Sequence, residues 1–163
     1  MKGKIITIAT QNSRCLGQGF IGRRKRKEIK HLFNHTTPKT DIILLQETKL
    51  PEVACLKQAR FIENKGGTSL WNEGSFSARS GRFTGGTRII LSERLATNVT
   101  NHSILYPGRA QYVTIRLSPQ LQLGVINIYG FSDTGARAML RNHIAQTELP
   151  EAEWILAGDF NNI

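Results

Sequence analysis

The sequence predicts an α/β fold within a single domain, on three observations. Apolar runs with the composition of buried strands occur at residues 4–10, 41–47 and 154–158. A stretch with helical periodicity at 23–35 separates the first two runs, which is the pattern of a strand–helix–strand unit. Between 88 and 129, four strand-like segments are joined by short turns, which favours antiparallel pairing. The 163 residues fit one domain.

The first two strands are each expected to deliver polar side chains at their ends. Lys4–Thr10 is rich in isoleucine and threonine, and a polar cluster with Asn12 and Arg14 follows it. The second strand, Asp41–Glu47, ends on a carboxylate. Because parallel strands joined by a helix end on the same side of a sheet, we expect Asn12 and Glu47 to lie on one side.

The helix expected at 23–35 has a strongly basic start. Its cationic residues are Arg23, Arg24, Lys25, Arg26, Lys27 and Lys30. We consider these residues, above all the arginines, as candidates for contacts with nucleic-acid phosphates. A solvated charged face is the alternative interpretation.

The middle of the chain predicts a short helix at Pro51–Ala59, followed by a hairpin or long surface loop at 64–87. This loop is rich in glycine, serine and aromatic residues, and its Arg79 and Arg82 add to the basic surface. Four successive strands are then expected, at Arg88–Leu91, Val99–Leu105, Ala110–Leu117 and Leu121–Tyr129.

A helix is expected near 137–148, because the segment 132–134 offers N-caps and Met139 and Leu140 belong to an apolar stripe. The apolar run Trp154–Gly158 then predicts a buried strand.

That last strand delivers Asp159 and Asn161 at its C-terminal end. The two residues are separated by two, so their side chains should project the same way. A carboxylate beside an amide at a strand end suggests a site. An ordinary Asp/Asn turn is the alternative.

Composition indicates a partner that carries phosphates. The chain has 22 Lys+Arg against 12 Asp+Glu, a formal net charge of +10 and a pI near 10.1. Cys15 and Cys55 are isolated thiols, which favours a reducing compartment over a disulfide framework or a zinc knuckle. The N-terminal apolar run is too short for a secretory signal or a membrane helix. We therefore expect an intracellular protein, in the nucleus or cytoplasm, that is neither secreted nor bound to a membrane.

Four strand-end motifs occur in an order that resembles the endonuclease/exonuclease/phosphatase superfamily, whose members have deoxyribonuclease-I-like folds. The motifs are Thr10-Gln11-Asn12-Ser13-Arg14, Leu45-Gln46-Glu47-Thr48-Lys49, Asn127-Ile128-Tyr129-Gly130 and Gly158-Asp159-Phe160-Asn161-Asn162. Two further segments, Gly85-Gly86-Thr87 and Pro107-Gly108-Arg109-Ala110, look like landmarks of LINE-type retrotransposon endonucleases. The resemblance implies a two-sheet α/β sandwich with the site between the sheets.

The resemblance also implies roles for particular residues in phosphodiester hydrolysis. Glu47 would be a ligand of Mg²⁺, with Mn²⁺ as a possible substitute, and Asn12 would orient the metal shell. Asp159 would align or deprotonate the attacking water, Asn161 would hydrogen-bond the scissile phosphate and Tyr129 would contact it. A hard divalent cation suits this reaction, because it neutralises phosphate oxygens and prefers carboxylate and water ligands.

The sequence departs from the family pattern at its C-terminal end. Family members carry a further Asp and a Ser-Asp-His segment, and this sequence stops at Ile163 before either. We therefore assign residues 1–163 to the N-terminal portion of a C-terminally truncated domain. Catalytic groups act together, so the isolated chain is expected to be nearly inactive. Open sheet edges are expected to favour self-association.

Three functions remain open at this stage. The favoured one is a Mg²⁺-dependent endonuclease that acts on nucleic acid, with DNA as the preferred substrate. Arg14 and Arg109 would also contact this nucleic acid. The second is a catalytically dead nucleic-acid-binding fragment. The third is a phosphatase of inositol phosphates or another small phosphoester, which the +10 charge disfavours relative to a polymeric substrate.

Overall fold

The computed structural model describes residues 5–16, 24, 27 and 40–161. The helix expected at 23–35 therefore lies almost wholly outside the described residues, and its prediction is not tested. The helix near 137–148 is confirmed, with bounds Thr134–Gln146 (α4), and Asp133 caps it by accepting a hydrogen bond from the Ala136 backbone N–H at 2.7 Å.

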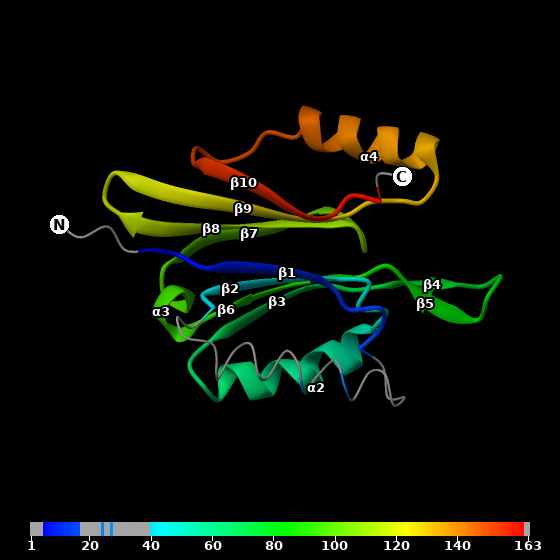
Figure 1. Ribbon diagram of the computed structural model, residues 1–163, viewed down its shortest axis with the longest axis horizontal. Coiled ribbons are helices and arrows are strands. Elements are labelled where there is room, and N and C mark those ends of the chain that lie inside the picture. The colour runs from blue at the N-terminus through cyan, green and yellow to red at the C-terminus, as the bar shows by residue number, and fades with distance from the viewer. Residues whose placement is uncertain (1–4, 17–23, 25–26, 28–39, 162–163) are drawn as a thin grey trace.

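Two four-stranded sheets stack face to face, and a helix covers the outer face of each (Figure 1). The first sheet has the order β1-β2-β6-β3 and the second β10-β9-β8-β7. The strands of the two sheets are β1 (Ile8–Asn12), β2 (Ile42–Gln46), β3 (Thr68–Asn72), β6 (Thr87–Leu91), β7 (Val99–Tyr106), β8 (Ala110–Ser118), β9 (Leu121–Tyr129) and β10 (Glu153–Asp159). The two-sheet α/β sandwich expected from the sequence is confirmed.

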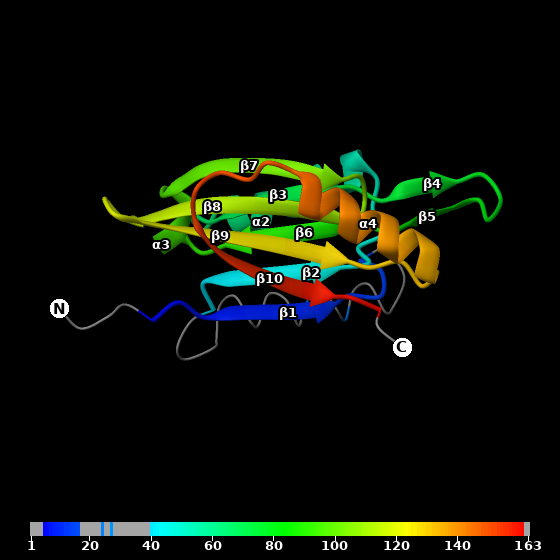
Figure 2. The same cartoon turned by 90° about the horizontal axis from the view of Figure 1, so that it is seen from above.

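Each sheet combines one parallel pair with antiparallel neighbours. β1 runs parallel to β2, and β10 runs parallel to β9. The remaining pairs, β2–β6, β6–β3, β9–β8 and β8–β7, are antiparallel. The parallel pairs bring the C-terminal ends of β1, β2, β9 and β10 to the same end of the sandwich (Figures 1 and 2).

Three apolar layers hold the sandwich together. The central layer fills the space between the sheets with Ile42, Leu44, Ile89, Leu91, Leu95, Val113, Ile115, Leu123 and Val125. A second layer packs the first sheet against α2 (Glu52–Glu63), and a third packs the second sheet against α4. β2 and β6 are buried along their whole lengths because both of their faces are covered.

The inner rows of the strands change from apolar to polar toward one end of the sandwich. Alternation along a strand puts every second side chain on the same face. On β2 the inner row runs from Ile42 and Leu44 to Gln46, and on β9 it runs from Val125 through Asn127 to Tyr129. The same change occurs at the ends of β1 and β10. The alternation therefore aims polar side chains into the space where the sheets end.

Several predicted boundaries differ from the structure. β1 begins at Ile8, four residues later than expected, and it ends at Asn12, two residues later than expected. The hairpin expected as one alternative at 64–87 is present as β4 (Ser75–Ser77) and β5 (Arg82–Thr84), and the same segment also contains β3, which pairs along its whole length with β6. The short helix expected at Pro51–Ala59 extends to Glu63, and α3 (Glu93–Ala96) was not expected. Met139 is 68% exposed, so its assignment to the apolar stripe was wrong.

The prediction of a buried last strand was also wrong. Ile155 is 40% and Leu156 52% exposed on β10. The cause is its position, since among the described residues β10 pairs with β9 alone and forms the edge of the second sheet. β1 is the corresponding edge of the first sheet, on the same side of the molecule (Figure 2). Self-association through these edges stays a prediction. No helix among the described residues is both long and apolar enough to cross a bilayer.

Candidate active site

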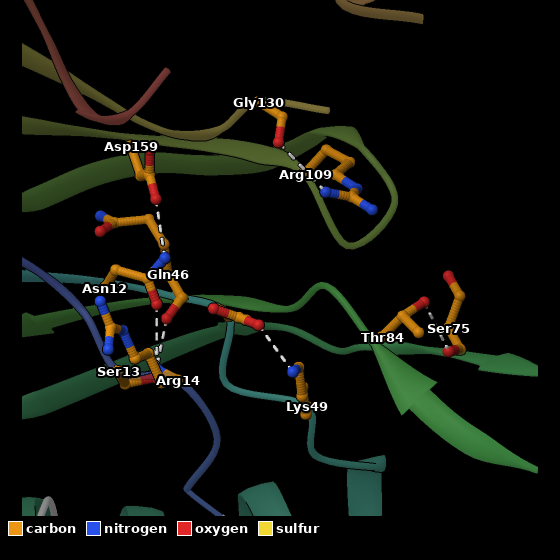
Figure 3. A network of polar contacts seen from close by, with 11 residues as sticks. Asn12, Ser13, Arg14, Gln46, Lys49, Ser75, Thr84, Arg109, Gly130 and Asp159 are labelled. Carbon is orange, nitrogen blue, oxygen red and sulfur yellow. Dashed lines mark hydrogen bonds and ion pairs between the residues drawn. The ribbon is translucent and has the colours of Figure 1, made fainter. Parts of the chain in front are cut away.

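A hydrogen bond between the ends of β1 and β10 joins the two sheets at the polar end of the sandwich. Asn12 Nδ2 donates to Asp159 Oδ2 at 2.7 Å across 147 residues of sequence. Asn12 Oδ1 accepts from the Arg14 backbone N–H at 2.9 Å, which fixes the orientation of the amide. Figure 3 shows Asn12 and Asp159 facing each other across the gap between the sheets. The carboxylate of Asp159 is thus held by the partner sheet.

Glu47 occupies the loop that directly follows β2. Its side chain is 19% exposed, and Oε1 lies 2.6 Å from Lys49 Nζ. The loop is held by the segment after β1, because the Cys15 N–H donates to the Glu47 carbonyl at 2.8 Å. The prediction that Asn12 and Glu47 end on one side of one sheet is confirmed.

Unusual backbone conformations are concentrated around these residues. Among the described residues, the non-glycine positions with positive φ are Arg14, Cys15, Glu47, Lys49 and Asn161. All five lie in the loops that follow β1, β2 and β10. Residues with a Cβ rarely adopt backbone conformations with positive φ, and those that do are concentrated at ligand-binding and active sites. The strain therefore marks the same end of the sandwich as the polar side chains.

Tyr129 ends β9 and is stacked against Arg109 from the turn between β7 and β8. The Arg109 guanidinium carbon lies 4.7 Å from the Tyr129 ring centroid and 4.1 Å from that of Phe131. Arg109 Nη1 also donates to the Gly130 carbonyl at 3.3 Å (Figure 3). This arrangement fixes both side chains at the edge of the site.

The environment of Tyr129 keeps its phenol protonated. Burial raises the pKa of Tyr129, and the charges of Glu47 and Asp159 raise it further, whereas Arg109 and Lys49 lower it. Burial lowers the pKa of the Arg109 guanidinium, and the neighbouring Tyr129 opposes that shift. The influence of both Glu47 and Asp159 on Tyr129 places the three groups in one electrostatic environment.

Asn161 lies in the turn after β10. Its backbone N–H donates to Asp159 Oδ1 at 3.0 Å, and its Nδ2 donates to the Gly130 carbonyl at 2.7 Å. Gly158 allows this turn to sit close to β9, because it has φ +141° and a Cβ there would collide with the backbone carbonyl of Ile128. Both carboxylate oxygens of Asp159 are therefore hydrogen-bonded.

A buried layer of amides beneath the site was not anticipated from the sequence. Asn127, fully buried, donates to the carbonyls of Leu45 at 3.0 Å and Arg88 at 2.9 Å. Its Oδ1 accepts from Gln46 Nε2 at 2.7 Å, and that nitrogen also donates to Thr10 Oγ1 at 3.1 Å. The layer thus ties β9 to β1, β2 and β6 directly below Glu47 and Tyr129. The sequence carries no signal for this layer, because the burial of Asn127 and Gln46 depends on the packing of the two sheets.

The predicted nucleic-acid contacts are only partly placed. Arg14 lies in the loop beside Asn12, and Arg109 is half-buried against aromatic rings. Arg24 is exposed, whereas Arg23 and Arg26 lie outside the described residues.

The donor groups present fit a hard divalent cation. Glu47 and Asp159 offer carboxylate oxygens, which Mg²⁺ and Mn²⁺ prefer. Among the residues that the structure describes, no three His, Cys, Asp or Glu side chains form a cluster that could hold a metal ion. His102 Nε2 lies 3.0 Å from Gln111 Oε1, and His143 Nε2 lies 2.9 Å from the Leu105 carbonyl oxygen.

Solved structures with the same architecture identify the fold. The chain superposes on the 3′ phosphatase NExo from Neisseria, bound to a product DNA hairpin, with a TM-score of 0.60 and 18% identity. The TM-score is 0.67 at 20% identity for TDP2 of D. rerio, humanized by 14 mutations, and 0.65 at 16% identity for an AP endonuclease from Archaeoglobus fulgidus. The chain has the fold of the endonuclease/exonuclease/phosphatase superfamily. This deoxyribonuclease-I-like fold is the one that the four motifs implied.

The three alignments each cover 96% of this chain but only 58%, 66% and 58% of the respective neighbours. The chain thus spans about three fifths of the length of these deoxyribonuclease-I-like structures. No protein-family model and no curated protein matches the sequence. The closer likeness to LINE-type endonucleases stays a prediction.

Proposed function

We propose that this chain belongs to a divalent-metal-dependent phosphodiesterase that acts on nucleic acid, with DNA as the favoured substrate. The observation that carries the proposal is the hydrogen bond from Asn12 to Asp159 between the two sheets, where strand pairing sets Tyr129 opposite Asp159 and sets Gln46, which precedes Glu47, opposite Asn12. Two carboxylates, two amides and a phenol from four strand ends meet at this point. Such a set can bind a cation, a phosphate and a water together.

In this proposal Asp159 aligns the attacking water. Asn12 and the Asn161 backbone hold the carboxylate, so its orientation is set before substrate binds. Asn161 uses one amide hydrogen on Gly130, and its second is the donor for a phosphate oxygen. Asn12 then influences the metal shell by orienting Asp159.

Tyr129 donates a hydrogen bond to the phosphate in its protonated form. The ordinary pKa of a tyrosine lies well above neutral pH and burial raises that of Tyr129 further, so this proton is present. The guanidinium of Arg109, stacked on the same ring, adds positive charge where negative charge develops. A Mg²⁺ or Mn²⁺ ion held by Glu47 would supply charge neutralisation at the phosphate oxygens.

The charge of the chain favours a polyanionic substrate over a small phosphoester. A net charge of +10 raises the local concentration of a polyanionic polymer and the rate at which it associates.

We also propose that turnover by this set of residues is slow. His102 and His143 are engaged elsewhere, and catalytic groups act as a unit.

A specific contact favours a second candidate, a nucleic-acid-binding chain without catalysis. Lys49 Nζ lies 2.6 Å from Glu47 Oε1, where a bound cation would compete with the ammonium. In this candidate Lys49 neutralises Glu47 permanently. Lys49→Met would then restore divalent-cation binding, which Mn²⁺ titration calorimetry measures.

Nicking of supercoiled plasmid tests the proposal. The purified chain is incubated with Mg²⁺ or with EDTA, beside a Glu47→Gln/Asp159→Asn variant and a control, Glu63→Gln/Glu148→Gln, at exposed positions. We expect slow nicking that requires metal, is lost in the site variant and persists in the control. Nicking that survives EDTA or the site variant would overturn the proposal. Absence of nicking with salt-sensitive DNA binding retained would support the second candidate.

A further inference from the structure

A two-stranded hairpin arm projects from the end of the sandwich that carries the site (Figures 1 and 2). It consists of β4 (Ser75–Ser77), β5 (Arg82–Thr84) and the turn between them. The segment 75–84 contains Arg79 and Arg82 and no acidic residue. Both arginines are exposed. The hairpin arm is thus a cationic projection, suited to a polyanion.

The hairpin arm also presents an aromatic surface to solvent. Phe76 pairs with Phe83 across the strands, and their ring centroids lie 5.5 Å apart at an interplanar angle of 63°. Phe76 remains 61% exposed although Phe83 packs against it. An exposed phenyl ring on an arm that also carries two exposed arginines is a combination that suits nucleic-acid strands, because every base has a face that stacks on an aromatic ring.

The base of the hairpin arm is fixed to the loop that carries Glu47. The Lys49 backbone N–H donates to the Gly85 carbonyl at 2.9 Å, and the Thr48 N–H donates to the Gly86 carbonyl at 3.1 Å. Gly86 has φ +90°, and a Cβ there would collide with the side chain of Thr48. On the other side, the Gly86 N–H donates to the Gly108 carbonyl at 2.9 Å, next to Arg109. The arm therefore has a defined position relative to Glu47 and Arg109.

We propose that the hairpin arm binds an unpaired base of the nucleic-acid substrate by stacking on Phe76, while Arg79 and Arg82 contact the flanking phosphates. The proposal rests on a nucleic-acid substrate for the site beside it. The arm extends about four residues from its base, or roughly 13 Å at the strand rise per residue. Phe76 lies in the second residue pair from the base of the arm, so the arm would select substrates with single-stranded character close to the site.

Binding in EDTA tests the arm without cleavage. Fluorescence anisotropy measures the affinity for a labelled single-stranded oligonucleotide and for its duplex. We expect Phe76→Ala to weaken single-strand binding by about 5- to 150-fold, the loss of one stacked base, and duplex binding by less than about 2-fold. Met139→Ala, which removes an exposed apolar side chain from α4, is the matched control and should change neither.

The arginines are tested by the salt dependence of the same affinities. Arg79→Ser/Arg82→Ser should reduce the slope of log K against log salt for the single strand by about 1.4, the loss of two phosphate contacts. The control Arg60→Ser/Arg141→Ser removes the same charge at exposed positions on α2 and α4. It should reduce the salt slope by less than half as much as the arm variant does.

Three results would overturn the proposal. Phe76→Ala could bind the single strand like the wild type, or lose duplex binding equally. The third would be found by sedimentation, if the wild type were self-associated and the Phe76→Ala variant were monomeric. The aromatic pair would then be a contact between protein chains. Failure of the arm is separable from failure of the site, because the arm is tested by binding in EDTA, whereas the site is tested by metal-dependent nicking, which Glu47→Gln should abolish.

Discussion

Asn127→Ala should destabilise the fold because Asn127 links the sheets beneath the site. The substitution removes three hydrogen bonds of 2.7 to 3.0 Å at a fully buried position. At about 1 kcal/mol for each neutral hydrogen bond, with a further term for the vacated volume, we expect the free energy of unfolding to fall by about 2 to 5 kcal/mol. With a urea m-value of roughly 2 kcal/mol/M, the midpoint should fall by about 1 to 2.5 M.

Urea unfolding followed by circular dichroism measures this loss. Asn142→Ala, at an exposed position on α4, is the matched control and should change stability by less than about 0.5 kcal/mol. A loss below about 0.5 kcal/mol for Asn127→Ala would show that the amide layer does not hold the sheets together. The account of how the site is positioned would then be wrong.

Three other predictions concern backbone and ionisation. Gly158→Ala should lower the free energy of unfolding by more than about 3 kcal/mol, because its Cβ would meet a β9 carbonyl. Gly81→Ala is the control, with φ +62° in open space, and should lower it by about 1 to 2 kcal/mol. Equal urea midpoints for the two variants would refute the predicted collision at Gly158. Arg109→Met should raise the pKa of Tyr129, since Arg109 lowers it, and an unchanged NMR titration of ¹³C-labelled tyrosine would contradict this. Burial raises the pKa of Cys55 from 9.0 to about 12. The contribution of the buried, protonated thiol to stability is therefore complete below pH 9 and is lost as pH rises toward 12. Between pH 8 and 10.5 the urea midpoint of Cys55→Ala should fall less than that of the wild type.

The strand ends could be predicted from sequence because they obey local rules. β2 is a short run of branched apolar residues, β9 is rich in them, and the period of two sets the face of each side chain. The parallel pairing of β1 with β2 brings Asn12 and Glu47 to one side of the first sheet, as the strand–helix–strand pattern predicts, whereas only the family resemblance implied that Asp159 would join them.

Features that depend on distant partners could not be predicted. β3 has the sequence Thr-Ser-Leu-Trp-Asn, which carries a weak strand signal, and it is a strand because it pairs with β6 and because Trp71 stacks on the buried Arg88 at 4.0 Å. The exposure of Leu156 depends on which strand flanks β10. Asn127 resembles any polar residue in a strand until its partners on the opposite sheet are known.

Paramagnetic broadening by Mn²⁺ tests most directly whether strand ends from both sheets form one cation site. In ¹⁵N-labelled protein titrated with Mn²⁺, we expect the amide signals around Glu47, Asn12 and Asp159 to broaden first, and Glu47→Gln to abolish the effect. The measurement does not depend on turnover. Broadening centred elsewhere, or broadening at these amides that persists in Glu47→Gln, would contradict the account.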